Sequence, residues 1–432
     1  MPVLLDTARP EFAEGFAALL AARRDAGESV DAVVAEILAA VERDGDAAVL
    51  DCTRRFDRLD IDAGRLRVDA DELAAAAAAC EPETLKALAL AKERIEDFHR
   101  RQRPADLDYR DGLGVRLGHR WTAIGAVGLY VPGGTAAYPS SVLMNAIPAQ
   151  VAGVERLAMA VPMPEGRVNP LVLAAANLLG IDEVYRMGGA QAVGAFAFGT
   201  ATVAAVDKIT GPGNAYVAAA KRQVFGRVGI DTIAGPSEIL VVADAANDPD
   251  WIAADLLSQA EHDAAAQSIL LTDDAGFAEE VQRRIERLLQ RLPRAEIAGR
   301  SWRDHGAIVV LRGLAEAPAL IDRVAPEHLE LAVADPEALL PAIRNAGAIF
   351  LGRHTPEALG DYLAGPNHVL PTDRAARFSS GLSVYDFMKR SSIVGATAES
   401  LRTLGPAAAR LAAAEGLDAH ALSLELRLSP EA

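Results

Sequence analysis

Ala123-Ile-Gly-Ala-Val-Gly-Leu-Tyr-Val131 is an apolar run of strand length, and Pro132-Gly-Gly134 follows it as a tight turn. A helical pattern begins a few residues later, near Pro139 or Ser140. A buried strand, a glycine-rich loop and a helix in this order form the repeating unit of a parallel α/β sheet, with the loops at the carboxyl edge. This stretch therefore predicts an α/β fold with a parallel sheet.

Units of the same kind recur along the chain. In the first half their loops are Gly188-Gly-Ala-Gln-Ala192 and Thr210-Gly-Pro-Gly-Asn214. A second series begins at Gly229, and its first loop presents Ser237. Two such series predict two similar, incomplete Rossmann-like domains. The expected strands span 123–131, 157–161, 183–187 and 206–209 in the first series, and 239–243, 268–271, 307–311 and 348–351 in the second.

The segments outside the two series are helical or short. Before Pro104, helical patterns are expected after a cap at Ser29, at 46–56 and at 71–103. Near the end, a helix is expected at 397–414, followed by a strand in which apolar and polar residues alternate, at 422–428. The first 26 residues and this tail are too short to bury cores of their own. Both are expected to pack against other parts, and the tail against a second subunit.

Composition narrows the class of protein. The chain has 432 residues, of which 51% are hydrophobic and 24% charged, the balance of a globular protein with more than one domain. A net charge of -17 disfavours binding to nucleic acid or an anionic membrane. Neither a membrane-length apolar run nor a secretory leader is recognisable. A cytoplasmic protein that acts on a small molecule is expected.

Three features could carry chemistry, and each has an ordinary structural explanation. The glycine loops suit a nucleotide, but βα turns use glycine anyway, and the fingerprint G-x-G-x-x-G is missing. Gln259 and His262 would share one face of a helix, either as metal ligands or as solvated residues. Asp361 and His368 lie in a Gly- and Pro-rich loop that is either a site or a connection. Residue pattern alone leaves these alternatives open.

Several longer blocks of sequence occur in a specific order. They are Ile230-Asp-Thr-Ile-Ala-Gly-Pro-Ser-Glu238, Gln259-Ala-Glu-His262, Pro326-Glu-His328, Gly360-Asp-Tyr362, Gly365-Pro-Asn-His368, and Glu415 with His420. Taken together, these blocks closely resemble the histidinol dehydrogenase family, and the resemblance runs from about residue 28 to the C-terminus. It implies an enzyme that oxidises L-histidinol through L-histidinal to L-histidine with two NAD, the last two steps of histidine biosynthesis.

The resemblance also implies roles for individual residues. It makes His328 the base that takes the hydroxyl proton and Glu327 the group that activates water for the second oxidation. The implied ligands of a zinc ion are Gln259, His262, Asp361 and His420, the last supplied by the partner in a homodimer. The implied substrate contacts are Ser237, Gln259, His262, His328, Asp361, His368, Glu415 and His420. The implied NAD contacts are Tyr130, Gln191 and Asn214.

The same resemblance suggests a domain division. Residues 106–235 would form the NAD-binding domain, and residues 27–105 with 236–380 the zinc and substrate domain. Residues 1–26 would be a dimerisation extension, and residues 381–432 a tail swapped between subunits.

Two other functions remain compatible with the residues. One is a related zinc- and NAD-dependent dehydrogenase of another polar alcohol. The other is a metal-dependent hydrolase with Glu327 as its base. A metal-binding scaffold without catalysis fits less well, because it would not need an adjacent acid and base.

Overall fold

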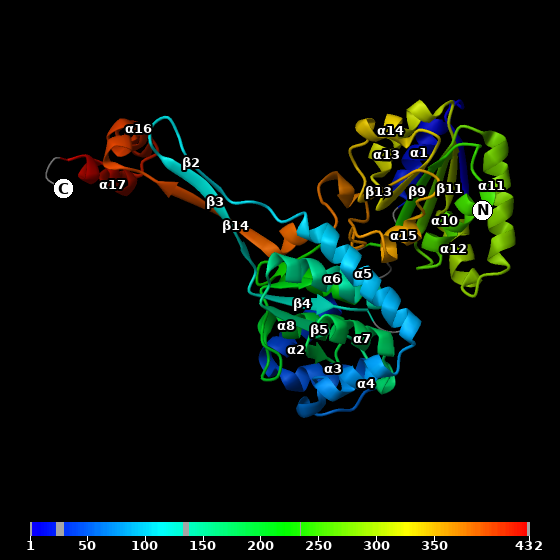
Figure 1. The fold of residues 1–432 in the computed structure, drawn as a ribbon, viewed down its shortest axis with the longest axis horizontal. Helices are drawn as coiled ribbons and strands as arrows, with labels where there is room; N and C mark the ends of the chain where they lie inside the picture. The colour runs from blue at the N-terminus through cyan, green and yellow to red at the C-terminus, as the bar shows by residue number, and fades with distance from the viewer. Residues whose placement is uncertain (1, 23–29, 133–137, 234, 430–432) are drawn as a thin grey trace.

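The computed structural model describes residues 2–22, 30–132, 138–233 and 235–429. Two α/β lobes lie side by side, and a slender arm projects from one of them (Figure 1). The parallel α/β fold predicted from the strand and loop pattern is confirmed. The cap predicted at Ser29 and the turn at Gly133 and Gly134 lie outside the described residues. No helix among the described residues is long and apolar enough to cross a membrane.

The first lobe is built on a five-stranded parallel sheet with the order β6-β5-β4-β7-β8. Helices cover both faces of this sheet, as its apolar strands require. Successive residues of β4 serve opposite faces: Leu129 packs into one core and Tyr130 into the other. The strands are β4 (Ala126–Tyr130), β5 (Arg156–Ala160), β6 (Glu183–Tyr185), β7 (Lys208–Thr210) and β8 (Gly229–Ile230), and the helices between them are α6 (Pro139–Ala152), α7 (Pro170–Leu178), α8 (Gly189–Phe198) and α9 (Ala215–Val224).

The N-terminal helices pack on this same sheet, which corrects the predicted domain division at residues 27–105. Leu38 and Val41 lie against Gly194, so close that a Cβ at Gly194 would stand 3.2 Å from each. The expected helix at 71–103 is two helices, because Asp69 caps the first and Pro82 begins the second. The helices are α2 (Asp31–Asp44) and α3 (Asp46–Phe56), which share a core with α8 and α9, and α4 (Ala70–Ala78) and α5 (Pro82–Arg100), which share one with α6 and α7.

The second lobe contains a six-stranded parallel sheet with the order β1-β11-β10-β9-β12-β13. Its central strand β9 (Glu238–Ala243) is buried along its whole length. On α11 (Ala275–Leu289), Phe277, Val281 and Ile285 form the buried stripe of an amphipathic helix. The other strands are β10 (Gln267–Thr272), β11 (Ala307–Val310), β12 (His328–Ala332) and β13 (Ala348–Leu351), and the other helices are α10 (Pro249–Ala260), α12 (Ala295–His305), α13 (Ala317–Val324), α14 (Pro336–Leu339) and α15 (Glu357–Tyr362).

The N-terminal segment is part of this second lobe. Strand β1 (Val3–Asp6) pairs in parallel with β11, and Phe16 and Leu19 of α1 (Phe12–Ala21) enter the core beneath the sheet. The expectation of a separate extension over residues 1–26 is therefore corrected for the described part of that segment. A role in dimerisation stays a prediction.

The arm is a three-stranded antiparallel sheet that ends in a helical hairpin (Figure 1). It takes β2 (Leu107–Arg110) and β3 (Arg116–Ala123) from the first half of the chain and β14 (Met388–Gly395) from the second. Helices α16 (Ala398–Ala414) and α17 (Asp418–Leu428) form the hairpin. The strand predicted at 422–428 is wrong, because these residues are helical and Leu428 packs against Gly405 of α16.

Candidate active site

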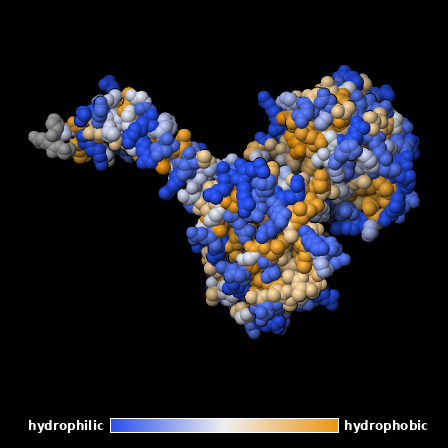
Figure 2. Space-filling model, viewed as in Figure 1, coloured by the Kyte–Doolittle hydropathy of each residue, from blue (hydrophilic) through white to orange (hydrophobic). Residues whose placement is uncertain are grey.

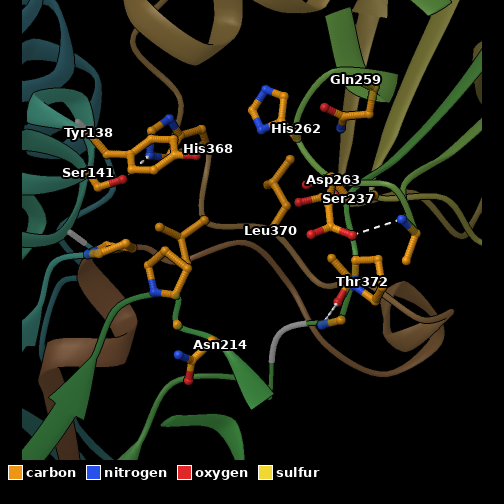
Figure 3. Close-up of a pocket in the computed structure, with 18 of the residues that line it drawn as sticks. Tyr138, Ser141, Asn214, Ser237, Gln259, His262, Asp263, His368, Leu370 and Thr372 are labelled. Carbon is orange, nitrogen blue, oxygen red and sulfur yellow. Dashed lines mark hydrogen bonds between the residues drawn. The ribbon is translucent and has the colours of Figure 1, made fainter. Parts of the chain in front are cut away.

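A cavity of about 840 Å³ lies between the two lobes. Figure 3 shows Tyr138 and Ser141 on one side and Gln259 and His262 on the other. The lobes present opposite edges of their sheets to this space. The first lobe contributes the carboxyl edge, through the loop that follows β7, and the second contributes the amino edge, where β9 and β12 begin. Ligand pockets commonly lie between domains, and open α/β sheets usually bind ligands at their carboxyl edge, as the first lobe does here.

His328 lies at the amino edge of the six-stranded sheet, where its Nδ1 contacts a backbone carbonyl. It begins β12 between β9 and β13, and the residue is 4% exposed. Its Nδ1 lies 3.0 Å from the carbonyl oxygen of Glu238, and the amide nitrogen of Gln259 lies 3.2 Å from the same oxygen. Nδ1 also lies 2.8 Å from the Gln259 amide nitrogen. In the tautomer that carries its proton on Nδ1, the ring donates to the Glu238 carbonyl and Nε2 has a lone pair that can act as a base.

Two buried polar atoms here have no hydrogen-bond partner. They are Nε2 of His328 and Oε1 of Gln259. Buried polar atoms normally have partners, so such atoms indicate a place where a ligand binds. Gln259 gives its nitrogen to the Glu238 carbonyl, which leaves its oxygen available to a cation.

Carboxylates surround the His328 ring. Glu357 and Asp361 stand 3.7 and 3.6 Å from Nε2, and Glu327 stands 3.7 Å from Nδ1. Burial raises the pKa of Glu327 to about 8, although its carboxylate accepts a hydrogen bond from the backbone of Glu238. Burial also raises the pKa of Glu357 to about 7. Burial alone would lower the pKa of His328, but the three carboxylates outweigh it and raise that pKa well above its ordinary value.

These carboxylates include a group that could hold a metal ion. Ligand atoms of His328, Glu357 and Asp361 lie within 4.8 Å of one another. Of the four ligands implied by resemblance, this group contains only Asp361. No feature of the residue pattern singles out Glu357, which follows Pro356 at the start of α15 and accepts a hydrogen bond from Ser258. Several buried acids around one imidazole make an environment that a divalent cation would stabilise.

His262 and His368 also face the cavity. His262 is not on the helix that carries Gln259, because α10 ends at Ala260 and His262 lies in the turn beyond it. His368 places Nδ1 3.0 Å from the Asp361 carbonyl oxygen and Nε2 3.4 Å from Oγ of Ser141, so it bridges the lobes. Burial lowers the pKa of both rings, which favours their neutral forms.

The three residues implied to hold NAD lie along the carboxyl edge of the five-stranded sheet. The Tyr130 hydroxyl accepts a hydrogen bond from the Gly189 amide, and burial raises the pKa of Tyr130 to about 12. Gln191 lies in the first turn of α8 and is 2% exposed. Asn214 caps α9 and lines the cavity itself. The edge is therefore continuous with the cavity through Asn214.

Comparison with known proteins identifies the family. The family model for histidinol dehydrogenase matches residues 20–428. The chain belongs to the histidinol dehydrogenase family. A histidinol dehydrogenase from Rhodospirillum rubrum is 65% identical over 99% of both chains, and one from Bradyrhizobium diazoefficiens is 61% identical over 99% of this chain and all of the relative. The crystal structure of histidinol dehydrogenase from Elizabethkingia anophelis superposes with a TM-score of 0.94, at 37% identity, over 99% of this chain and 98% of that one.

The residues that the histidinol dehydrogenase family resemblance implies do not all lie together in this chain. Ser237, Gln259, His262, Glu327, His328, Asp361 and His368 all line the cavity. Glu415 and His420 do not, because they lie in the helical hairpin at the far end of the arm, where both are exposed (Figure 1). Within one chain, the structure therefore brings seven of the predicted substrate and catalytic residues together and leaves two apart.

Proposed function

We propose that this chain oxidises L-histidinol through L-histidinal to L-histidine, consuming one NAD in each of two successive oxidations. These are the last two steps of histidine biosynthesis. The observation that carries the proposal is the pair of Glu327 and His328, buried side by side in the wall of the cavity that both lobes line. Family membership, and relatives over 60% identical that are named histidinol dehydrogenase, support the choice of substrate.

We propose that Tyr130, Gln191 and Asn214 hold NAD at the carboxyl edge of the five-stranded sheet. Glycine loops and helix N-termini gather at this edge, and both favour a bound pyrophosphate. Bound there, NAD would supply the hydride acceptor. Asn214 and His328 line the same cavity, so a cofactor at this edge has access to a substrate held beside His328.

We propose that Gln259, His262 and Asp361 hold a zinc ion together with His420 from a second copy of the chain. The unpaired Oε1 of Gln259, the neutral ring of His262 and the Asp361 carboxylate are suitable oxygen and nitrogen donors. Zinc bound there would hold the amino and imidazole nitrogens of the substrate. His328 is assigned as the base and not as a ligand, because its Nε2 lone pair must stay available for a proton.

The chemistry then divides between two residues. A cation bound beside Asp361 would offset the carboxylates around His328 and favour its neutral ring. In the first oxidation, Nε2 of this neutral ring takes the hydroxyl proton while the alcohol carbon gives up a hydride. The aldehyde carbon next adds the oxygen of a water, and the carboxylate form of Glu327 takes a proton from that water. Protonated His328 returns its proton to the former aldehyde oxygen, which completes the diol and leaves Nε2 free again. The resulting diol loses a second hydride to a second NAD, and His328 again takes a hydroxyl proton. Each oxidation releases two electrons as hydride and one proton, and the product is a carboxylic acid.

We propose that the arm delivers Glu415 and His420 to the site of a second copy. Large apolar side chains on the hairpin are exposed: Leu411 is 67% exposed, Leu422 52% and Leu426 58%. The space-filling view shows the arm standing away from the body of its own chain (Figure 2). An exchanged element that buries such side chains on a partner is a common route to a homodimer.

Subunit complementation tests the shared site. His262→Ala damages the body of one chain, and His420→Ala damages only the tail of another. Random mixing should recover about a quarter of the normal activity, because half of the dimers are mixed and each has one intact site. Mixtures as inactive as the separate variants would show that each tail serves its own chain.

The substrate assignment is tested by initial rates of NADH formation with zinc present. We expect NADH from histidinol and little from a small polar diol without an imidazole, since His368 and the tail residues favour an imidazole. A preference for the diol would support the related dehydrogenase. Absence of NADH, with hydrolysis of an ester or amide, would support the hydrolase.

A further inference from the structure

Lys221 and Asp231 form a buried ion pair in the first lobe that none of the roles above uses. Each side chain is 3% exposed. Lys221 lies on α9, and its ammonium also donates to the carbonyl oxygens of Gly211, at 3.1 Å, and Thr232, at 2.9 Å. The pair lines the cavity between the lobes.

The pair holds both sides of one residue, Gly211. The amide of Gly211 donates to Oδ2 of Asp231 at 2.7 Å, while its carbonyl accepts from Lys221. Gly211 has a φ of +116°, and a Cβ there would stand 2.0 Å from the carbonyl oxygen of Tyr130. The loop is thus pressed against the end of β4 by contacts that leave no room for a side chain.

This loop runs directly into Asn214. Its residues 211–214 line the cavity, and the Asn214 side chain accepts from the amides of Tyr216 and Val217 to begin α9. Lys221 lies on that same helix. The ion pair therefore holds the Gly211 end of the loop, and the cap holds the Asn214 end. With both ends held, the Asn214 side chain stays in one position.

A buried ion pair usually adds little to the folding stability of a protein. Removing two charges from water costs several kcal/mol, and well-packed apolar residues often serve as well or better. What the charges provide here is a set of directed hydrogen bonds to the backbone of a glycine loop. Apolar side chains could not hold those peptide groups in one orientation.

We propose that Lys221 and Asp231 are positioning residues that hold the Gly211–Asn214 loop in the shape that binds NAD. This inference rests on the proposed placement of NAD at this edge of the sheet. It adds that the affinity for NAD depends on two residues that need not touch it.

The double variant Lys221→Met with Asp231→Leu tests the proposal without leaving one charge buried alone. We expect KM for NAD to rise about tenfold or more, with kcat at saturating NAD and KM for histidinol nearly unchanged. The pair Lys221→Gln with Asp231→Asn keeps the donors and acceptors without the charges. It should restore KM for NAD to within about threefold of the parent.

The matched control is the ion pair of Arg156 and Glu183, which joins β5 and β6 in the same lobe and does not line the cavity. Arg156→Met with Glu183→Leu should change stability without a selective change in KM for NAD. If the Lys221 and Asp231 double variant does not fold, Lys221→Arg provides the test, because its longer side chain should displace the Gly211 carbonyl and raise KM for NAD about threefold.

An unchanged KM for NAD in folded Lys221→Met with Asp231→Leu, or in Lys221→Arg where that double variant does not fold, would overturn the proposal. So would equal losses in kcat and in both KM values that match the control pair, because that pattern is purely structural. Failure to restore KM with the Gln and Asn pair would also contradict the hydrogen-bond account. A parent protein that neither binds NAD nor oxidises histidinol would instead overturn the proposed function itself.

Discussion

Replacing His328 with Asn separates the two tasks of its ring. The Asn amide nitrogen can occupy the place of Nδ1 and keep the bond to the Glu238 carbonyl, which is 3.0 Å long in the parent. Nothing replaces Nε2, the atom proposed to take the proton. The residue is 4% exposed, so the variant loses some packing, and it removes the imidazole that stands beside Glu327, Glu357 and Asp361.

Loss of a general base typically costs 10²–10⁴ in rate, so we expect kcat to fall by about that factor, or about 3–5 kcal/mol in activation free energy. Because the hydrogen bond survives, the free energy of unfolding should fall by only about 1–2 kcal/mol. Zinc content should stay at the parent level.

Three measurements on one preparation decide the matter: kcat from NADH absorbance at saturating substrates, zinc by mass spectrometry, and unfolding in urea. His354→Asn, on a surface loop, is the control for the substitution itself. Loss of zinc in proportion to activity would refute the reasoning, because His328 would then be a ligand with Glu357 and Asp361. A kcat within tenfold of the parent would remove it as the base.

Three further outcomes are expected. Glu327→Gln should slow oxidation of histidinal more than oxidation of histidinol, measured with each compound supplied separately; equal slowing would contradict the division of roles. Truncation after Ala414 should abolish zinc retention and activity, and an active truncated protein would contradict the shared site. Asp57→Asn should raise the Tm more at pH 8 than at pH 5. Burial raises the pKa of Asp57 to about 6, so the folded chain loses stability as pH rises between the unfolded value and 6. A pH-independent effect on Tm would show that Asp57 is not held at a raised pKa.

The sequence predicted most strands of the two parallel sheets, because strands buried on both faces are recognisable as short apolar runs. β9, from Glu238 to Ala243, is one such run and was expected at nearly the same residues. The pattern missed β12 beside β9, where His328 and Glu330 interrupt the apolar run. Alternation of apolar and polar residues was a less reliable sign of a strand. Leu422, Leu424, Leu426 and Leu428 alternate with other residues as in a strand, yet they form a helix because α16 provides a surface for one side of it. Tertiary contact overrode the local pattern.

The packing partners of amphipathic helices could not be predicted from their own residues. The apolar stripe of α2 shows that one face is buried but not which sheet buries it. Local sequence also does not show which residues meet at the active site. Resemblance placed Gln259, His328 and Asp361 on the cavity, but Glu357 has no distinctive neighbours in sequence. Only the packing of α15 against β12 and α10 places its carboxylate beside His328.

The most direct test of the account is the ratio of NADH formed to histidine formed. Purified protein would be loaded with zinc and given limiting L-histidinol with excess NAD, with NADH followed by absorbance and histidine by chromatography. The account predicts two NADH for each histidine, with little free histidinal. A ratio of one with histidinal as the product, or no NADH at all, would contradict it.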